Sequence, residues 1–260
     1  MTPCDFSQLD RAGLNLQAVF NLDSLPPGIR SQLQQYMEDG AKFRQLILIG
    51  NAGAQLWPAV KAAGIASPDP IDDFSVRTVT DWFNTCFGAR HRKLIYPGNT
   101  PVGLQALGRL AGWHHASPFK VGINQDWGTW FAYRVVLLAD TALPLAPPGH
   151  APSPCDNCSD RPCIAACPAQ AMTHGEFDLN LCIDYRHRPG SRCAATCVAR
   201  LACPVGSAHR YPSEQIAHGY SNSLRMIEHY RNMSATSKMK RWQTGSRSKT
   251  TCCTRSHHIT

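Results

Sequence analysis

Eight of the twelve cysteines in this chain of 260 residues lie between Cys155 and Cys203. They form two sets, namely Cys155-x2-Cys158-x4-Cys163-x3-Cys167-Pro168 and Cys182-x10-Cys193-x3-Cys197-x5-Cys203-Pro204. Cysteines at this spacing are typical of metal sites, because closely spaced thiolates wrap one loop around a centre while a distant segment supplies a further ligand. Two zinc sites and two iron–sulfur clusters would each use all eight thiolates, so the spacing leaves both chemistries open.

Each set ends in Cys-Pro, which resembles the cysteine runs of bacterial ferredoxins with two [4Fe–4S] clusters. In those ferredoxins the fourth cysteine of each run ligates the other cluster. The resemblance implies one cluster on Cys155, Cys158, Cys163 and Cys203, and a second on Cys167, Cys182, Cys193 and Cys197. The first set departs from the usual spacing, because Ser159–Pro162 adds residues before the third cysteine.

The residues before the cysteines alternate between strand-like and helix-like stretches, which predicts an α/β domain over residues 1–143. The expected strands are Gln45–Ile49, Lys93–Tyr96 and Trp130–Leu138. The expected helices are Ala54–Ala63, Asp73–Phe87 and Val102–Gly112, and Gly50–Gly53 is expected to form the turn before the first of them.

Residues 144–154 hold five prolines and are predicted to be a linker, because proline at this density continues neither a helix nor a central strand. A small ferredoxin-like domain is expected over residues 155–222, and its few large apolar residues indicate that it needs metal to fold. Residues 223–260 are predicted to be a disordered basic tail. From His229 onward the chain has seven Lys or Arg and no Asp or Glu.

The net charge of +8 at pH 7 is therefore concentrated in the tail, and the remainder of the chain is nearly neutral. This distribution argues against nucleic acid as a partner. If the cysteines hold iron–sulfur clusters, the expected partner is a redox protein or a small-molecule substrate. No apolar stretch is long enough for a transmembrane helix, and the N-terminus lacks the basic region of a secretory signal. We expect a cytoplasmic protein without membrane contact, in which cysteines serve metals rather than disulfides.

Four residues before the linker are candidates for cofactor binding: His114, Trp130, Phe131 and Arg134. The two aromatic rings could stack on a flat cofactor, Arg134 could meet an amide or a phosphate, and His114 could ligate a metal or transfer protons. Plainer alternatives exist for each. Trp130 and Phe131 would pack in the core, Arg134 would face solvent, and His114 would lie on the surface at a helix end. No catalytic residue is assigned.

The cysteine sets, together with the upstream segment Trp130–Arg134 (WFAYR), resemble the cobalamin-dependent epoxyqueuosine reductases and their shorter ferredoxin-like relatives. Asn124–Leu138 also resembles a segment of the CblC-type cobalamin-processing proteins. The resemblance covers about residues 90–210. It implies that the α/β domain binds a corrinoid, cobalamin, and that two clusters deliver single electrons to its cobalt.

Two departures argue against epoxyqueuosine reduction itself. Asn99 stands where the reductases carry an aspartate that looks like their proton donor, and an amide cannot supply a proton as a carboxylic acid does. We also expect no helical-repeat domain for transfer RNA after the cysteines. The leading hypothesis is thus an iron–sulfur protein that relays electrons to a cofactor or partner. The alternatives are a pure electron carrier without chemistry of its own and a zinc-stabilised binding module.

Overall fold

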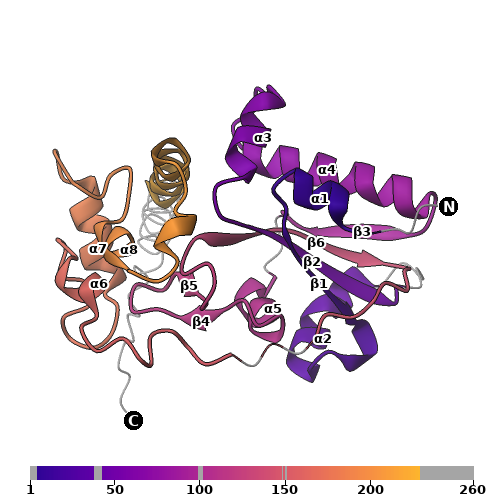
Figure 1. Ribbon diagram of the computed structural model, residues 1–260, viewed down its shortest axis with the longest axis horizontal. Coiled ribbons are helices and arrows are strands. Elements are labelled where there is room, and N and C mark those ends of the chain that lie inside the picture. Colours follow the sequence, from indigo (N-terminus) through magenta and orange to yellow (C-terminus); the bar gives the residue numbers. More distant parts are fainter. Residues whose placement is uncertain (1–4, 38–42, 99–101, 148, 150, 229–260) are drawn as a thin grey trace, which may run out of the picture.

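The structure is a computed structural model, and it describes residues 5–37, 43–98, 102–147, 149 and 151–228 (Figure 1). Two of the predictions lie outside the described residues. One is the missing proton donor at Asn99, and the other is the character of the tail beyond residue 228.

The centre of the fold is a four-stranded sheet in the order β1-β2-β6-β3. These strands are β1 (Leu16–Asn21), β2 (Gln45–Ala52), β6 (Phe131–Ala139) and β3 (Arg92–Tyr96). Every neighbouring pair is antiparallel. All eight residues of β2 are buried, because apolar clusters pack on both faces of the sheet. The three predicted strands are confirmed, whereas β1 was not predicted.

The turn predicted at Gly50–Gly53 is wrong for its first three residues. Gly50, Asn51 and Ala52 continue β2 and pair with β6. The chain turns only at Gly53, whose φ of 71° lies in the left-handed region that glycine adopts without strain. β2 therefore extends to Ala52, which pairs with Phe131 of β6.

Three helices cover one face of the sheet: α1 (Ser7–Arg11), α3 (Leu56–Ala62) and α4 (Pro70–Phe87) (Figure 1). The helix expected from Asp73 begins at Pro70, since proline suits the first turn of a helix and the Asp72 and Asp73 carboxylates favour its N-terminus. It ends at Gly88, which has a positive φ of 59°. This long helix brings Asp72 close to β6.

The opposite face packs against α2 (Pro27–Leu33), α5 (Leu104–Leu110) and two short 3-10 turns, Leu22–Ser24 and Gln34–Tyr36. Figure 1 shows α2 and α5 on the side of the sheet away from α4. The predicted helix at Val102–Gly112 is confirmed in its central part. A small hairpin of β4 (His115–Ala116) and β5 (Gly122–Ile123) leads from α5 toward the cysteines.

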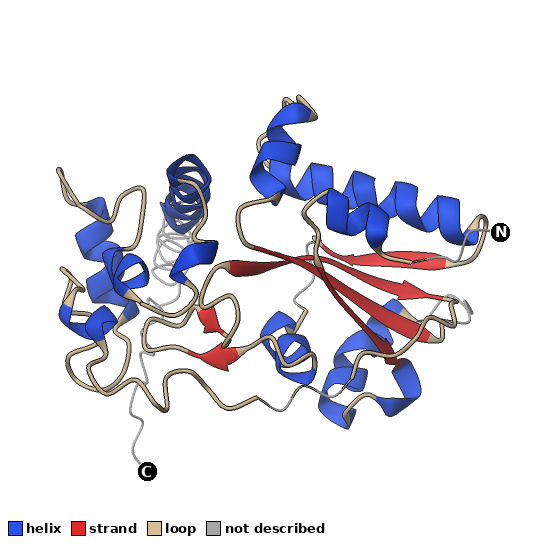
Figure 2. Ribbon diagram, in the orientation of Figure 1, coloured by secondary structure: helices blue, strands red, loops and turns tan. Residues whose placement is uncertain are grey.

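The described residues of 144–154 form neither helix nor strand. Beyond them lie three short helices, α6 (Pro162–Ala165), α7 (Leu179–His187) and α8 (Val198–Ala202), and the 3-10 turn Ser207–His209. Loops dominate this part of the molecule (Figure 2). Its buried cluster holds Phe119, Cys163, Met172 and Ala199. So small a cluster is consistent with the expectation that this region has few apolar residues of its own.

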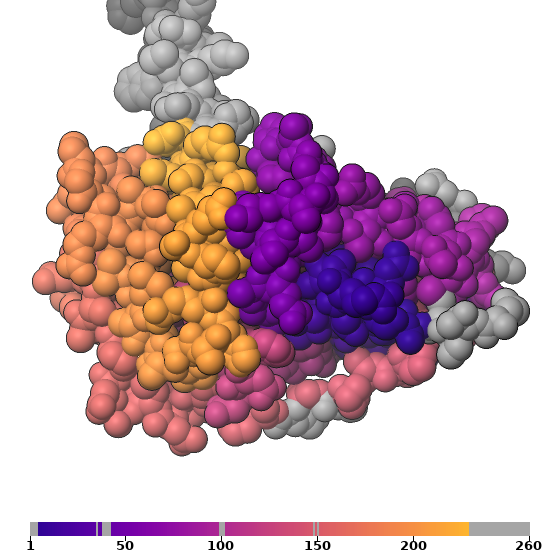
Figure 3. All heavy atoms as spheres, turned by 45° about the horizontal axis from the view of Figure 1, so that its top comes forward, coloured from indigo at the N-terminus to yellow at the C-terminus, as the bar shows by residue number. Residues whose placement is uncertain are grey.

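A helix over residues 213–228 lies between the cysteine region and α3 (Figure 3). Lys61 Nζ in α3 lies 2.8 Å from Glu214 Oε2, and the Trp57 and His218 rings pack with centroids 5.2 Å apart. Residues 223–228, predicted as part of the tail, are helical. Among the residues described, none of the helices combines the length and apolarity needed to cross a membrane.

Candidate functional site

The four cysteines Cys155, Cys158, Cys163 and Cys203 line one enclosed hollow, which we call the first thiol group. Phe119 and Ile123, from the segment around the β4–β5 hairpin, form part of its wall. Four of the other lining residues are prolines. Cys163 and Cys203 are buried. A thiol from the second cysteine set therefore lies with three from the first.

The electrostatics of the first thiol group agree with this proximity. Burial raises the pKa of the Cys155 thiol, and the neighbouring Cys203 and Cys158 raise it further. The pKa of Cys163 is raised by burial and then by Cys203 and Cys155. A bound cation would reverse these effects, because it stabilises the thiolate form.

The remaining cysteines, Cys167, Cys182, Cys193 and Cys197, form the second thiol group. Burial raises the pKa of Cys182 to about 11, and Cys197, Cys167 and Cys193 each contribute to that rise. Burial is also the main cause of the raised pKa of Cys197. Cys167, from the first set, thus lies with three thiols of the second.

Two short helices separate the cysteines of each sequence set, so that Cys167 and Cys203 each lie with thiols of the other set. Cys163 lies in α6, whereas Cys167 follows the end of that helix. Cys197 is the N-cap of α8 and Cys203 is its C-cap, so a five-residue helix separates them. The two helices pack together. Cys163 and Cys203 lie in the first thiol group, whereas Cys167 and Cys197 lie in the second.

All eight thiols are free of disulfides. In the part of the chain that the structure describes, no three or more His, Cys, Asp or Glu side chains are arranged to hold a metal ion. The thiols are grouped as the ferredoxin resemblance implies, and their role as cluster ligands stays a prediction.

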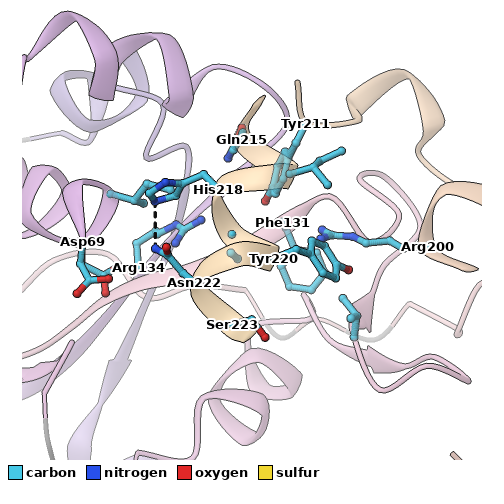
Figure 4. A pocket seen from close by; sticks show the side chains of 16 residues that line it. Asp69, Phe131, Arg134, Arg200, Tyr211, Gln215, His218, Tyr220, Asn222 and Ser223 are labelled. Atoms are coloured by element: carbon cyan, nitrogen blue, oxygen red, sulfur yellow. Dashed lines mark hydrogen bonds between the residues drawn. The ribbon is translucent and has the colours of Figure 1, made fainter. Parts of the chain in front are cut away.

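A cleft of about 440 Å³ lies between the start of α4, β6, α8 and the helix over residues 213–228 (Figure 4). Its apolar lining includes Ile71, Val121, Phe131 and Ile216. Its polar lining comprises Asp69, Asp72, Arg134, Arg200, Tyr211, Gln215, His218, Tyr220, Asn222 and Ser223. Both the volume and the mixed lining are typical of small-molecule sites.

Arg134 reaches the cleft because β6 carries a β-bulge. Ile49 pairs with Val135 and Gly50 with Tyr133, so Arg134 has no partner in the register. Its Nε donates a hydrogen bond to Asn51 Oδ1 at 2.7 Å. Figure 4 shows its guanidinium group directed toward the helix over residues 213–228. The bulge thus places a cation on the cleft wall.

Asp72 is the acidic neighbour of Arg134. Burial raises the pKa of the Asp72 carboxyl, and the Arg134 cation partly opposes that rise. Burial also raises the pKa of Tyr96, and the Asp72 carboxylate raises it further. The cleft therefore holds the Arg134 cation close to the half-buried Asp72 carboxyl.

The structure brings two of the four predicted cofactor residues together, since Phe131 and Arg134 both line the cleft. Trp130 is fully buried beside Tyr211, and the Arg200 guanidinium lies 4.3 Å from the Trp130 ring centroid. Trp130 thus packs in the core, which was the plainer alternative.

His114 is 6% exposed, so the plainer alternative of a surface position is wrong. Its Nδ1 lies 3.0 Å from the Tyr133 hydroxyl, and burial lowers its pKa. The lining of the cleft does not include it.

Sequence reasoning missed the contributions of Asp72, Arg200 and the helix over residues 213–228. A signal for that helix was present. Gln215, Ile216, Gly219, Tyr220 and Ser223 recur at spacings of three and four residues, and all five line the cleft. Because the chain is strongly basic after residue 228, the tail was predicted to begin at residue 223, and this helical pattern was not recognised.

No family model and no curated protein matches the chain. Among solved structures, an epoxyqueuosine reductase with an epoxyqueuosine-modified tRNA stem loop matches with a TM-score of 0.52 at 13% identity, covering 82% of this chain and 68% of the other. The epoxyqueuosine reductase of Bacillus subtilis matches with a TM-score of 0.51 at 14% identity, covering 80% and 66%. The chain shares the fold of epoxyqueuosine reductases.

The resemblance inferred from the cysteines and the Trp130–Arg134 segment is therefore confirmed for the fold. A CblC protein of C. elegans, described as a B12-trafficking protein, also matches, with a TM-score of 0.40 at 11% identity over 83% of this chain and 93% of the other. The chain spans about two thirds of the length of the epoxyqueuosine reductases that it matches. At these identities the likeness concerns the mixed α and β architecture.

Proposed function

We propose that this protein is an iron–sulfur redox protein that relays electrons through two [4Fe–4S] clusters to an acceptor in the cleft. The observation that carries the proposal is the arrangement of the eight free thiols in two groups of four. Cys203 of the second sequence set lies in the first group, and Cys167 of the first sequence set lies in the second group. Such crossing is typical of two-cluster ferredoxins. Bound clusters would supply one-electron transfer, and the chain's own residues would hold and shield them.

The second thiol group adjoins the cleft. Tyr220 lines the cleft, and a hydrogen bond between its hydroxyl and the Cys197 thiol partly opposes the burial that raises the pKa of Cys197. Arg200, which lies in α8 between Cys197 and Cys203, lines the same cleft. This continuity favours an acceptor in the cleft over a pure electron carrier. The proposed partner in this electron transfer is a redox protein or a small-molecule substrate.

Anaerobically purified protein is expected to contain roughly eight iron and eight acid-labile sulfide per chain, as two cubane clusters require. Metal analysis and sulfide assay on the same sample measure both quantities. Stoichiometric zinc without sulfide would instead establish the zinc-stabilised binding module and contradict the proposed redox function.

A corrinoid is the cleft occupant that the family resemblance suggests, and the lining fits it in chemistry. An apolar wall with Phe131 suits the hydrocarbon edge of a macrocycle, and Gln215, Asn222 and Ser223 could bind its peripheral amides. The volume of about 440 Å³ suits a drug-sized ligand, whereas a corrinoid is much larger. Only an edge of the macrocycle would enter the cleft in this arrangement.

Titration of cluster-loaded protein with hydroxocobalamin is expected to give a saturable change in the cobalamin absorbance. Gly219→Trp should abolish that change, because Gly219 lines the cleft and no atom lies within 4 Å of where its Cβ would stand. The matched control is Gly28→Trp in α2, which also has open space around its Cβ and lies outside the cleft lining. Absence of any change with the unaltered protein would favour the pure electron carrier.

We do not extend epoxyqueuosine reduction to this chain. By the resemblance in sequence, Asn99 takes the place of the acid of those reductases, and loss of a general acid typically lowers a rate by about 10²–10⁴-fold. Corrinoid binding without turnover of epoxyqueuosine-containing transfer RNA is therefore the expected combination.

A further inference from the structure

Arg186 in α7 is a buried cation with neutral partners. It is 7% exposed. Its Nη2 donates to the Tyr220 carbonyl oxygen at 2.8 Å, its Nη1 to Ser223 Oγ at 3.3 Å, and its Nε to the Cys193 carbonyl oxygen at 3.3 Å. The guanidinium carbon also lies 5.3 Å from the centroid of the Tyr220 ring. These acceptors are neutral and supply no negative charge.

A buried cation normally requires a counter-charge. Within the described residues, the ion pairs join Arg44 to Asp140, Lys61 to Glu214 and His187 to Glu228, and Arg186 takes part in none of them. Burying a charge without a counter-charge is unfavourable, because nothing compensates fully for the loss of its hydration. Among the described residues, Arg186 is therefore a buried charge that a nearby anion would stabilise.

The second thiol group is the neighbour that can supply this anion. Arg186 lies close enough to Cys182 to oppose the rise in the pKa of that thiol, and it hydrogen-bonds the backbone of Cys193. With neutral thiols the group carries no charge. Four thiolates around an iron–sulfur cluster form an anionic unit, so a loaded second group would pair with Arg186.

The first thiol group has a different electrostatic environment. Arg161 lines its hollow and acts on Cys155, but its side chain is exposed to solvent. Water screens an exposed charge, whereas a buried charge acts through a medium of lower dielectric constant. The two groups thus differ in how strongly a cation stabilises added negative charge.

We propose that Arg186 is the counter-charge of the second thiol group and holds the reduction potential of the cluster there above that of the cluster in the first group. This inference rests on the proposed iron–sulfur function. One-electron reduction adds one negative charge to an already anionic unit, and a fixed buried cation favours the reduced form. An electron supplied by a low-potential donor then resides in the second group, next to Tyr220 and the cleft.

The test is a redox titration followed by electron paramagnetic resonance, with dithionite as the one-electron reductant. In Arg186→Gln, the ratio of reduced to oxidised second cluster at a fixed poise should fall about tenfold, which for a one-electron couple corresponds to 59 mV. Arg186→Lys should retain most of the potential, because it keeps the charge while losing the forked hydrogen bonds. The control is Arg188→Gln, an exposed arginine that follows the same helix, which should shift neither cluster.

The Cys155→Ala background assigns the shifted signal, because it is expected to retain only the second cluster. Loss of the second cluster in Arg186→Gln together with its retention in Arg186→Lys would also support the counter-charge. Unchanged potentials in Arg186→Gln, or equal damage in both Arg186 variants, would overturn it. Unaltered protein without iron and sulfide would instead refute the proposed function itself.

Discussion

Cys167→Ala is expected to remove the cluster of the second thiol group, although Cys167 belongs by sequence to the first set. The physical reason is proximity, since Cys167 lies past the end of α6 and contributes to the raised pKa of Cys182. Iron content should fall from roughly eight to about four per chain, because one cubane is lost and the other retains all its ligands.

Double variants make this prediction sharp, since two substitutions in one site are not additive. Cys167→Ala combined with Cys182→Ala should leave about four iron per chain, as in either single variant. Cys167→Ala combined with Cys155→Ala should leave almost none. If the first combination empties both sites and the second only one, each cluster is held by consecutive cysteines and the crossing is wrong.

The elements that the sequence predicted are those whose signal is local. Gln45–Ile49 and Trp130–Leu138 are apolar runs rich in β-forming residues, and each forms a central strand buried on both faces. Such signals need no knowledge of the rest of the fold. The crossed assignment of the cysteines came from the resemblance to two-cluster ferredoxins, and it stays a prediction.

The features that the sequence did not predict depend on distant contacts. The direction of Arg134 follows from a β-bulge against β2, and a bulge leaves no trace in the alternation of β6 itself. His114 is buried because Tyr133 and Gly122 close over it, although its position after a helix suggested the surface. The alternation of helices and strands also gave no indication that the sheet is antiparallel throughout.

Two glycines fix the cysteine region to the sheet domain, and neither was recognised from the sequence. Gly128 (φ 56°) and Gly206 (φ 63°) lie backbone to backbone. A Cβ at Gly128 would overlap the Val205 carbonyl oxygen and lie 2.6 Å from its carbonyl carbon. Val205 follows Cys203-Pro204, so this contact helps to hold the fourth thiol of the first group in place.

Gly128→Ala is therefore expected to destabilise the protein and to remove the first cluster while sparing the second. A left-handed alanine costs about 1–2 kcal/mol by itself. Overlap with backbone, which cannot rotate away as a flexible side chain does, adds roughly 1–3 kcal/mol. Displacement of Val205 would also move Cys203 out of the hollow that it shares with Cys155, Cys158 and Cys163.

Thermal unfolding and iron content of purified Gly128→Ala measure the two effects. The matched control is Gly64→Ala, because Gly64 has a similar φ of 60° and nothing lies within 4 Å of its Cβ position. The control carries the same backbone strain without the overlap, so it should lose stability modestly and keep roughly eight iron per chain. Equal loss of stability in both variants, with iron retained in both, would show that the contact between Gly128 and Gly206 does not hold the first thiol group. A lower midpoint for Gly128→Ala together with about four iron per chain would establish that the backbone contact and the first cluster depend on each other.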